Sequence, residues 1–213
     1  MSEACETLHH WFNAMERHCF PFDESQIPLD GIYILFEKGE IAHGEDRIVR
    51  IGTHTGEGQL RSRLKQHFIA ENKDRSIFRK NIGRCLLNKE RDTFLNDWEQ
   101  DLTTRDAKDR HAAAIDSIKQ ATVERNVTKR IQENFSFVVF EMKEKERRLG
   151  LESKMISTVS LCDECLPSKN WLGRFSPKEK IRDSGLWLVN ELYKEPLSNG
   201  DMESLRVTLG QNV

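Results

Sequence analysis

The sequence predicts an α/β fold in which a small, mainly antiparallel central sheet of three strands is packed by helices and carries a helical insertion. Two β-branched runs, 31–37 and 47–53, flank a polar stretch that contains glycine, a pattern typical of a β-hairpin. Segment 135–142 is aromatic and β-branched throughout, which makes it the clearest strand in the chain. Elsewhere apolar residues recur at helical spacing, so we expect helices to cover this sheet.

Helical patterns flank these strands. Residues 5–18 form a short amphipathic pattern, and 59–70 place apolar residues on one helical stripe. Ser76 is a suitable N-cap for the helix that follows, since its hydroxyl can accept from a free backbone N–H. A charged helix is predicted at about 145–161, and 186–189 is predicted as an edge strand.

The length of 213 residues suits one domain with additions. We expect an N-terminal helical extension over 1–28 and a core domain over 29–195. Within the core, about 90–134 is polar and nearly free of glycine and proline, so we expect an insertion of surface helices. The tail 196–213 is predicted to be flexible.

Composition indicates a soluble protein without a membrane partner. Hydrophobic residues make up 37% and charged residues 32% of the chain, and no apolar run reaches the length of a membrane span. The acidic start is unlike a signal peptide. Five cysteines are an odd number and are widely spread, which favours reduced thiols and a cytoplasmic location.

The positive charge is concentrated in one segment. Residues 58–91 contain ten lysines and arginines against three acids, a net +7, so the rest carries −9 because the whole chain has −2. A local basic zone is the expected footprint of phosphate contacts, and the global sum hides it. The alternative is that two solvated amphipathic helices carry these charges.

A tyrosine, an arginine and a histidine follow one another on three consecutive predicted elements. Gly31-Ile32-Tyr33 lies on the first strand, Arg50-Ile51-Gly52 on the second, and Arg63 with His67 on the next helix. Arg63 and His67 are one helical turn apart, so they share a face beside the apolar stripe. A guanidinium can bind two phosphate oxygens together, and histidine can transfer protons near neutral pH.

A carboxylate falls on the apolar stripe of the last predicted helix. Glu152 comes three residues after Leu149 and four before Ile156. A carboxylate that faces a core is costly unless it is paired, hydrogen-bonded or bound to a cation. Alternatively, Glu152 reaches solvent or pairs with a nearby arginine.

This ordered set resembles the GIY-YIG nuclease superfamily over roughly 29–84 and 135–172. The family carries one tripeptide on each of two strands, an Arg-x-x-x-His on the next helix and a glutamate on a helix after the third strand. The resemblance implies a GIY-YIG-like fold and a metal-dependent endonuclease that hydrolyses phosphodiester bonds in DNA. It also implies a single divalent metal, Mg²⁺ or Mn²⁺.

The resemblance also implies roles for individual residues. Glu152 would bind the metal, and Arg63 would stabilise the pentacovalent transition state. Tyr33 and His67 would orient or deprotonate the attacking water, although a phenol with an ordinary pKa near 10 needs help from nearby positive charge. Asn170 resembles the asparagine that supports the family site, although a loop asparagine is ordinarily a turn former.

The chain departs from the family at Arg50, where most members have tyrosine. Arginine cannot act as a base in a protein, so Arg50 can only bind charge or polarise the nucleophile. Arg61 competes with Arg63 for the arginine role, but the spacing to His67 favours Arg63. The departure keeps a second class open, a catalytically impaired nucleic-acid-binding module. A third class is a structural protein whose basic zone faces an acidic partner.

The expected partner is double-stranded DNA, with cutting of both strands by a homodimer or by two encounters. Restriction or defence and DNA repair are both open as biological roles. Candidates for phosphate contacts come from the basic segment, against the alternative of a solvated face: Arg61, Lys65, Arg79, Lys80 and Arg84.

The pair Cys162-x-x-Cys165 has the spacing of half a zinc site. A second pair is missing, and His18 and Cys19 are the partners that a long-range contact would have to supply. We therefore do not predict zinc. The sequence also has no P-loop, dinucleotide-binding glycine pattern or Gly-x-Ser-x-Gly elbow, which leaves nucleotide binding and acyl transfer without support.

Overall fold

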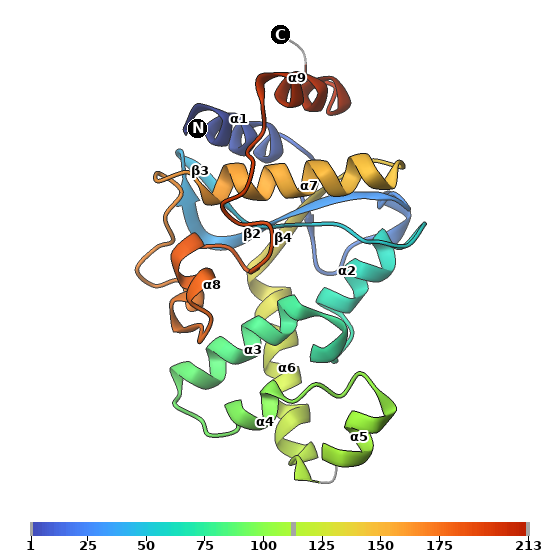
Figure 1. Cartoon of the computed structure of the whole chain (residues 1–213), viewed down its shortest axis with the longest axis vertical. Coiled ribbons are helices and arrows are strands. Elements are labelled where there is room, and N and C mark those ends of the chain that lie inside the picture. Colours follow the sequence, from blue (N-terminus) through green and yellow to red (C-terminus); the bar gives the residue numbers. More distant parts are fainter. Residues whose placement is uncertain (1, 112–113, 212–213) are drawn as a thin grey trace.

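The computed structural model describes residues 2–111 and 114–211, and its centre is one antiparallel sheet with strand order β1-β4-β2-β3. Helices lie on both sides of this sheet (Figure 1). The α/β class is confirmed, but the prediction of three strands was wrong by one. The strands are β1 (His18–Cys19), β2 (Gly31–Ala42), β3 (Glu45–Gly52) and β4 (Phe135–Glu141).

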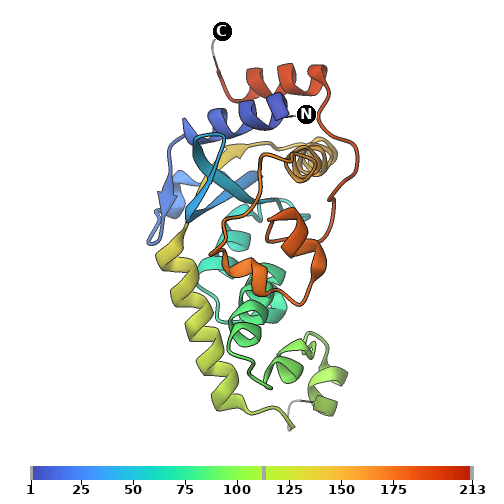
Figure 2. The same cartoon turned by 90° about the vertical axis from the view of Figure 1, so that its left-hand side faces the viewer.

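The helices divide between the two ends of the molecule. In both views α1, α7 and α9 lie on one side of the sheet, while α2 to α6 extend from the other side (Figures 1 and 2). None of the described helices is both long and apolar enough to cross a bilayer. The α-helices are α1 (Ser2–Asn13), α2 (Leu60–Phe68), α3 (Ile77–Lys89), α4 (Leu95–Glu99), α5 (Arg105–His111), α6 (Ser117–Asn134), α7 (Lys145–Ser160), α8 (Glu179–Ser184) and α9 (Asn199–Thr208).

The predicted hairpin is present, and its strands are longer than expected. Tyr33 pairs with Gly52 across β2 and β3, and with Val139 across β2 and β4. The predicted edge strand at 186–189 was wrong, since these residues form a loop. That loop still touches the sheet, because Trp187 N–H donates to Val49 O at 2.8 Å.

Strand β2 is buried on both faces, which explains its nearly continuous apolar sequence. Ile32 and Ile34 belong to the core cluster under α1 and α7, while Tyr33 and Leu35 belong to the cluster under α2, α3 and α6. Alternate side chains of a strand point to opposite faces, so one segment serves two cores. The tyrosine motif therefore lies on the α2 side of the sheet.

The insertion is more than a surface addition. Its long helix α6 contributes Val123, Val127 and Ile131 to the core, and Trp98 of α4 is fully buried with its indole N–H donating to Lys80 O at 3.0 Å. These apolar positions are spaced by one helical turn along α6, which explains their burial. Residues 112 and 113 of the insertion lie outside the described residues.

The segment predicted as a flexible tail contains helix α9. Ser198 and Asp201 form a capping box at its start. In this motif the side chain of each residue accepts a hydrogen bond from the backbone N–H of the other. Asp201 is also held by Lys154 of α7 at 2.9 Å. Helix α9 thus lies over α1 and α7 (Figure 2), and residues 212 and 213 lie outside the described residues.

A buried ion pair joins α3 to α6. Arg79 is fully buried, and its Nη2 lies 2.8 Å from Glu124 Oε2 and 2.7 Å from Thr128 Oγ1. Its Nη1 donates to His67 O at 3.1 Å. The guanidinium therefore ties three elements together, and removal of either charge leaves the other buried without its partner.

We expect Arg79→Ala to lower the free energy of unfolding by about 3–5 kcal/mol, because it strands the buried Glu124 carboxylate. The measurement is urea denaturation at neutral pH. The control is Lys129→Ala, which breaks an exposed pair with Glu133 on the same helix and should change stability by less than about 1 kcal/mol. Equal losses for the two variants would contradict this account of Arg79.

Candidate active site

A chain of hydrogen bonds links β2, α2 and the start of α3. The Tyr33 hydroxyl lies 2.8 Å from His67 Nε2, and His67 Nδ1 lies 2.7 Å from Ser76 Oγ. Ser76 is the N-cap of α3, as its sequence position predicted, and also accepts from Arg79 N–H. The three side chains are buried. The chain therefore fixes the phenol and the imidazole relative to each other.

Arg50 contacts the same tyrosine from the neighbouring strand. Its Nε–H donates to the Tyr33 hydroxyl oxygen at 3.4 Å, and its Nη1 donates to Trp187 O. The guanidinium also lies over the ring of Phe78, 5.5 Å from the centroid. Arg50 thus places a permanent charge beside the phenol, in the position where the family usually has a second tyrosine.

His67 is a neutral imidazole at physiological pH. Burial holds its pKa well below the ordinary value, and the positive charges of Arg63, Arg50 and Arg79 lower it further. A neutral imidazole has one donor and one acceptor nitrogen. That inventory matches its two partners, the Tyr33 hydroxyl and the Ser76 hydroxyl, in either tautomer.

Both motif glycines allow close contacts that a larger residue would block. A Cβ on Gly52 would lie 2.2 Å from the Tyr33 hydroxyl oxygen, and one on Gly31 would lie 2.2 Å from Phe140 O. Neither glycine has a positive φ, so the requirement is space rather than backbone conformation. Gly52 in particular leaves room for the phenol to reach His67.

Glu152 of α7 lies near enough to this group for Arg50 and Arg63 to act on the pKa of its carboxyl. Burial raises the pKa of its carboxyl to about 7, while Arg50, the Thr53 backbone N–H and Arg63 act in the opposite direction. The predicted stripe thus places a half-buried carboxylate near two arginines. Within the described chain, Glu152 has no basic side chain within ion-pair distance.

A polar depression lies beside Arg63. Its volume is about 270 Å³. The Arg63 Nη1 donates to Gln66 Oε1 at 3.1 Å and to Arg75 O at 3.0 Å, which holds the guanidinium at the rim. The depression is lined by Thr53, His54, Thr55, Gln59, Ser62, Arg63 and Gln66.

His54 is a lining residue that the motif search missed. Gly31 N–H donates to His54 Nε2 at 3.3 Å, so Nε2 carries no proton. The proton is therefore on His54 Nδ1, which donates to Gly56 O at 2.6 Å. Burial lowers its pKa, in agreement with a neutral ring. The only signal in the sequence was a histidine just after the second strand. Its bonds fix the loop that borders the depression.

The Glu152 surroundings fit a hard divalent cation. A largely buried carboxylate with a raised pKa is stabilised by a nearby cation, and threonine hydroxyls and waters are compatible further ligands. Magnesium usually keeps several waters and uses one or two carboxylates. The single carboxylate of Glu152 is compatible with that requirement.

Three predicted DNA contacts are corrected by the structure. Arg79 is buried against Glu124, and Arg84 forms two bonds to the Glu99 carboxylate at 2.5 and 2.6 Å. Lys80 donates to Glu99 O at 3.0 Å. All three are buried and pack α3 against α4 and α6, so they do not form a phosphate-binding face.

The remaining predicted residues lie nearer the surface. Arg61 donates to Ile27 O at 2.7 Å, and Lys65 is exposed and pairs with Glu24 at 2.7 Å. Asn170 is exposed in the loop that precedes Trp171. Among the described residues, no hydrogen bond joins Asn170 to Glu152, so its supporting role stays a prediction.

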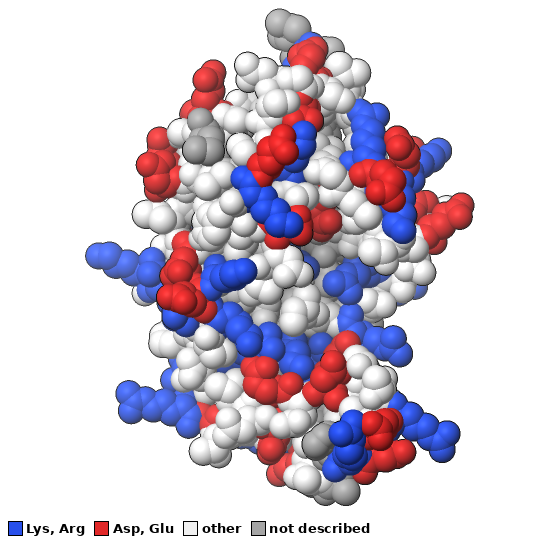
Figure 3. All heavy atoms as spheres, in the orientation of Figure 1, with Lys and Arg blue, Asp and Glu red and all other residues white. Residues whose placement is uncertain are grey.

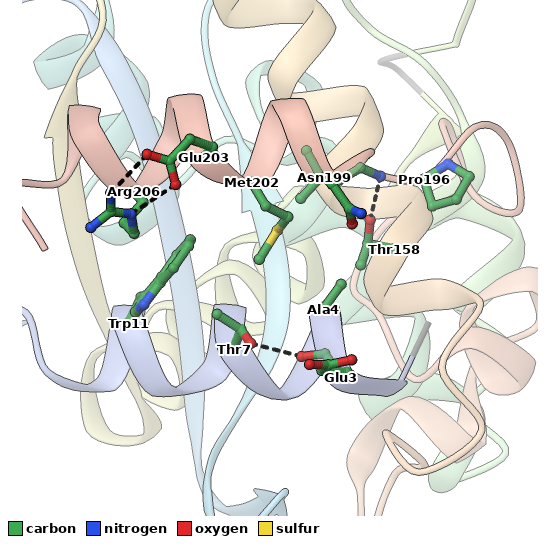
Figure 4. A pocket seen from close by; sticks show the side chains of 11 residues that line it. Glu3, Ala4, Thr7, Trp11, Thr158, Pro196, Asn199, Met202, Glu203 and Arg206 are labelled. Carbon is green, nitrogen blue, oxygen red and sulfur yellow. Dashed lines mark hydrogen bonds and ion pairs between the residues drawn. The ribbon is translucent and has the colours of Figure 1, made fainter. Parts of the chain in front are cut away.

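A larger cavity lies on the opposite side of the sheet, between α1 and α9 (Figure 4). Its volume is about 520 Å³. Thr158 and Met202 face it, and the charged pair Glu203 and Arg206 on its rim is joined by two hydrogen bonds. The cavity is thus a gap in the packing of two helices and lies apart from the motif residues.

We expect Gly52→Ala to destabilise the protein by about 1–3 kcal/mol, because the added methyl group overlaps the Tyr33 phenol. The matched control is Gly150→Ala in α7, where a Cβ meets nothing within 4 Å. This control should be more stable by about 0.5–1 kcal/mol through helix propensity. Urea denaturation measures both, and a Gly52→Ala protein as stable as the wild type would contradict the packing described.

We expect His67 to reduce the free energy of unfolding as the pH is lowered from about 7 to 5. The unfolded His67 binds a proton near its ordinary pKa of 6.5, whereas the buried one does not, so acid favours the unfolded state. Glu152 acts in the opposite direction, because its pKa is raised to about 7 and the folded state therefore binds its proton first. Between pH 7 and 5 the wild type should therefore lose more stability, or gain less, than His67→Gln, which keeps the contributions of Glu152 and His54. The control His10→Gln changes an exposed ring. Equal slopes for wild type and His67→Gln would refute a neutral buried His67.

Comparison with known proteins agrees with this geometry. The family model described as the GIY-YIG domain matches residues 15–210, which is most of the chain. A search of curated proteins and a search of solved structures found no match. GIY-YIG domains are in general nuclease domains, and the resemblance inferred from the motif order is confirmed by the family match. The chain belongs to the GIY-YIG domain family.

Proposed function

We propose that this protein is a metal-dependent endonuclease that hydrolyses phosphodiester bonds in DNA. The observation that carries the proposal is the convergence of a proton-transferring pair, two arginines and a carboxylate from four elements. Tyr33 and His67 share a hydrogen bond, Arg50 contacts the phenol, and Arg63 lies close enough to Glu152 to act on the pKa of its carboxyl. These groups match what phosphoryl transfer requires.

Glu152 is the residue that would hold the cation, Mg²⁺ or Mn²⁺. When bound, such a cation supplies charge neutralisation at the scissile phosphate and a more acidic water. The raised pKa of Glu152 supports this assignment, because a carboxyl in this environment gains from a positive neighbour.

The arginines differ in their tasks. Arg63 lines the polar depression, and its fork of N–H groups is suited to two non-bridging phosphate oxygens as their charge increases. Arg50 is buried and directs its Nε–H to the phenol oxygen, so it stabilises negative charge on Tyr33. Arg50 therefore acts on the phenol electrostatically and does not accept a proton.

In the free protein burial and the nearby arginines disfavour an imidazolium, so His67 Nε2 takes the phenol proton only when the phosphate of bound DNA offsets these positive charges. Transfer then leaves a phenolate beside Arg50, and that phenolate is a stronger base than the phenol. In this role the water that attacks phosphorus loses its proton to Tyr33. Because Tyr33 is fully buried, a covering side chain must move before water reaches it.

Positive side chains gather across the waist of one face, at the level of α2, α3 and α8, with acidic groups above and below (Figure 3). We place the DNA backbone along this band, with Arg61 and Lys65 as further phosphate contacts. The proposed substrate is duplex DNA, and a homodimer would cut both strands. Defence and repair both fit, and five free thiols support a cytoplasmic setting.

A catalytically impaired nucleic-acid-binding module is the second candidate. One observation favours it, the complete burial of the Tyr33 hydroxyl beneath Arg50 and His67. In such a protein Arg50 would be a structural replacement for the family tyrosine. The module would bind DNA in a salt-sensitive way and produce no new strand ends.

The deciding experiment incubates supercoiled plasmid with the purified protein, with and without Mg²⁺ or Mn²⁺. We expect metal-dependent nicking or linearisation, and a loss of at least about 100-fold in Glu152→Gln, since even outer-shell partners of a metal contribute 10–100-fold. Glu146→Gln is the matched control, because Glu146 is exposed on the same helix.

The outcomes separate the candidates. Full activity of Glu152→Gln would refute the assigned metal ligand. Salt-sensitive DNA binding without cleavage, by wild type and variant alike, would favour the binding module. If the protein has no DNA affinity at any salt concentration, the third class is favoured, a structural protein whose basic zone faces an acidic partner.

A further inference from the structure

Four potential metal ligands come together on the side of the sheet away from Tyr33. Cys5 and His9 lie one turn apart on α1, His43 is in the turn between β2 and β3, and Cys165 is in the loop after α7. One ligand atom from each lies within 4.8 Å of the other three. The four residues come from three distant parts of the sequence.

The measured separations match those between zinc ligands. Zinc–sulfur bonds of about 2.3 Å and zinc–nitrogen bonds of about 2.0 Å give tetrahedral edges of roughly 3.8 Å between sulfurs and roughly 3.5 Å between sulfur and nitrogen. The Sγ atoms of Cys5 and Cys165 are 3.6 Å apart, and Cys165 Sγ is 3.4 Å from His9 Nε2. Both distances lie close to those edges.

Both imidazoles are held by the nitrogen that would not bind metal. His9 Nδ1 lies 2.8 Å from Cys5 O, and His43 Nδ1 lies 3.7 Å from the Glu164 carboxylate. Zinc-binding histidines ordinarily direct their second N–H to a carbonyl or carboxylate, which fixes the tautomer. His9 Nε2 thereby faces Cys165 Sγ at 3.4 Å, and His43 Nε2 lies 3.6 Å from the sulfur of Cys162, which is not one of the four.

One contact competes with this arrangement. Ile48 N–H donates to His9 Nε2 at 3.1 Å, so a metal at that nitrogen has to replace this bond. A neutral hydrogen bond contributes far less than a zinc–imidazole bond, so the replacement is favourable.

The hairpin turn brings His43 to the cluster. His43 and Gly44 have φ of 53° and 79°, the two positive values that a two-residue turn between paired Ala42 and Glu45 requires, and histidine adopts such a φ more readily than most residues. Cys5, His9, Cys165 and the His43 side chain are buried together. The turn thus places a buried imidazole beside two buried thiols.

We propose a structural zinc site formed by Cys5, His9, His43 and Cys165. Four protein ligands close the coordination sphere, so the site stabilises the fold and does not bind substrate. Zinc there would fasten α1 and the hairpin turn to the loop after α7. Its two cysteines belong to the core cluster under α1 and α7, on the opposite face from the Tyr33 cluster.

The first test measures zinc in the full-length protein, expressed without an affinity tag and purified without chelator. The expected result is about one zinc per chain, with a lower melting temperature after a strong chelator and recovery when Zn²⁺ is restored. Replacement by Co²⁺ should give sulfur-to-cobalt charge-transfer absorption. Absence of zinc together with absence of this absorption would overturn the proposal, as would a Cys5–Cys165 disulfide in the native protein.

Variants test the ligand set. Cys5→Ser and His43→Gln should each reduce bound zinc at least tenfold, and His9→Gln should do the same. The control is Cys162→Ser, since Cys162 Sγ lies 3.6 Å from His43 Nε2 but outside the mutually close four. If Cys162→Ser loses zinc while His9→Gln keeps it, the assignment of His9 is wrong. If a variant fails to fold, Co²⁺ titration of the wild type takes its place as the test. The intensity of the sulfur-to-cobalt charge-transfer band then reports the number of thiolate ligands, and two are expected.

Discussion

Arg50 carries a permanent positive charge into the interior beside the hydroxyl of Tyr33, and the neighbouring groups are arranged around that charge. Its N–H groups are bound by the phenol oxygen and by Trp187 O, while Phe78 presents its ring. The same charge helps to keep His67 neutral and opposes the raised pKa of Glu152. Burial has the largest effect on the pKa of both groups, and this guanidinium acts on the two of them in addition.

A second buried charge fixes the loop that supplies the Trp187 carbonyl. The carboxylate of Glu37 on β2 accepts from the indole N–H of Trp171 and of Trp187, each at 2.9 Å, and from Arg130 of α6 at 2.7 Å. Both oxygens are thus satisfied, which makes the burial of this acid tolerable. Since the loop is fixed to the middle of β2, its backbone can meet Arg50 on the adjacent strand.

Local patterns predicted the hairpin, strand β4, the Ser76 cap and the arrangement of Tyr33 with His67. Each depends on residues that are close in sequence or on elements that follow one another. The pattern of α3 could not show that Arg79 and Arg84 are buried, because their partners Glu124 and Glu99 come from the insertion. Cys5, His43 and Cys165 likewise converge only through the fold, so no second cysteine pair close in sequence could reveal the cluster.

The partners considered from the sequence, His18 and Cys19, lie instead in β1, where His18 packs on Phe137.

Many of the positive charges in the basic segment 58–91 are already paired with acids of the same chain, which limits what they can contribute to DNA binding. Five of its ten cations pair with acids in the described chain: Lys65, Lys73, Arg79, Lys80 and Arg84. Each phosphate contact makes the slope of log binding constant against log salt concentration steeper by roughly 0.9. Cations that are already paired with acids make fewer such contacts, so internal pairing limits the DNA affinity that this segment can supply. Under the proposed function, the rest would come from Arg63 at the depression, from a cation at Glu152 and from a second copy of the chain. Binding and cleavage would then depend on the same few groups, since such a cation would supply charge neutralisation for both.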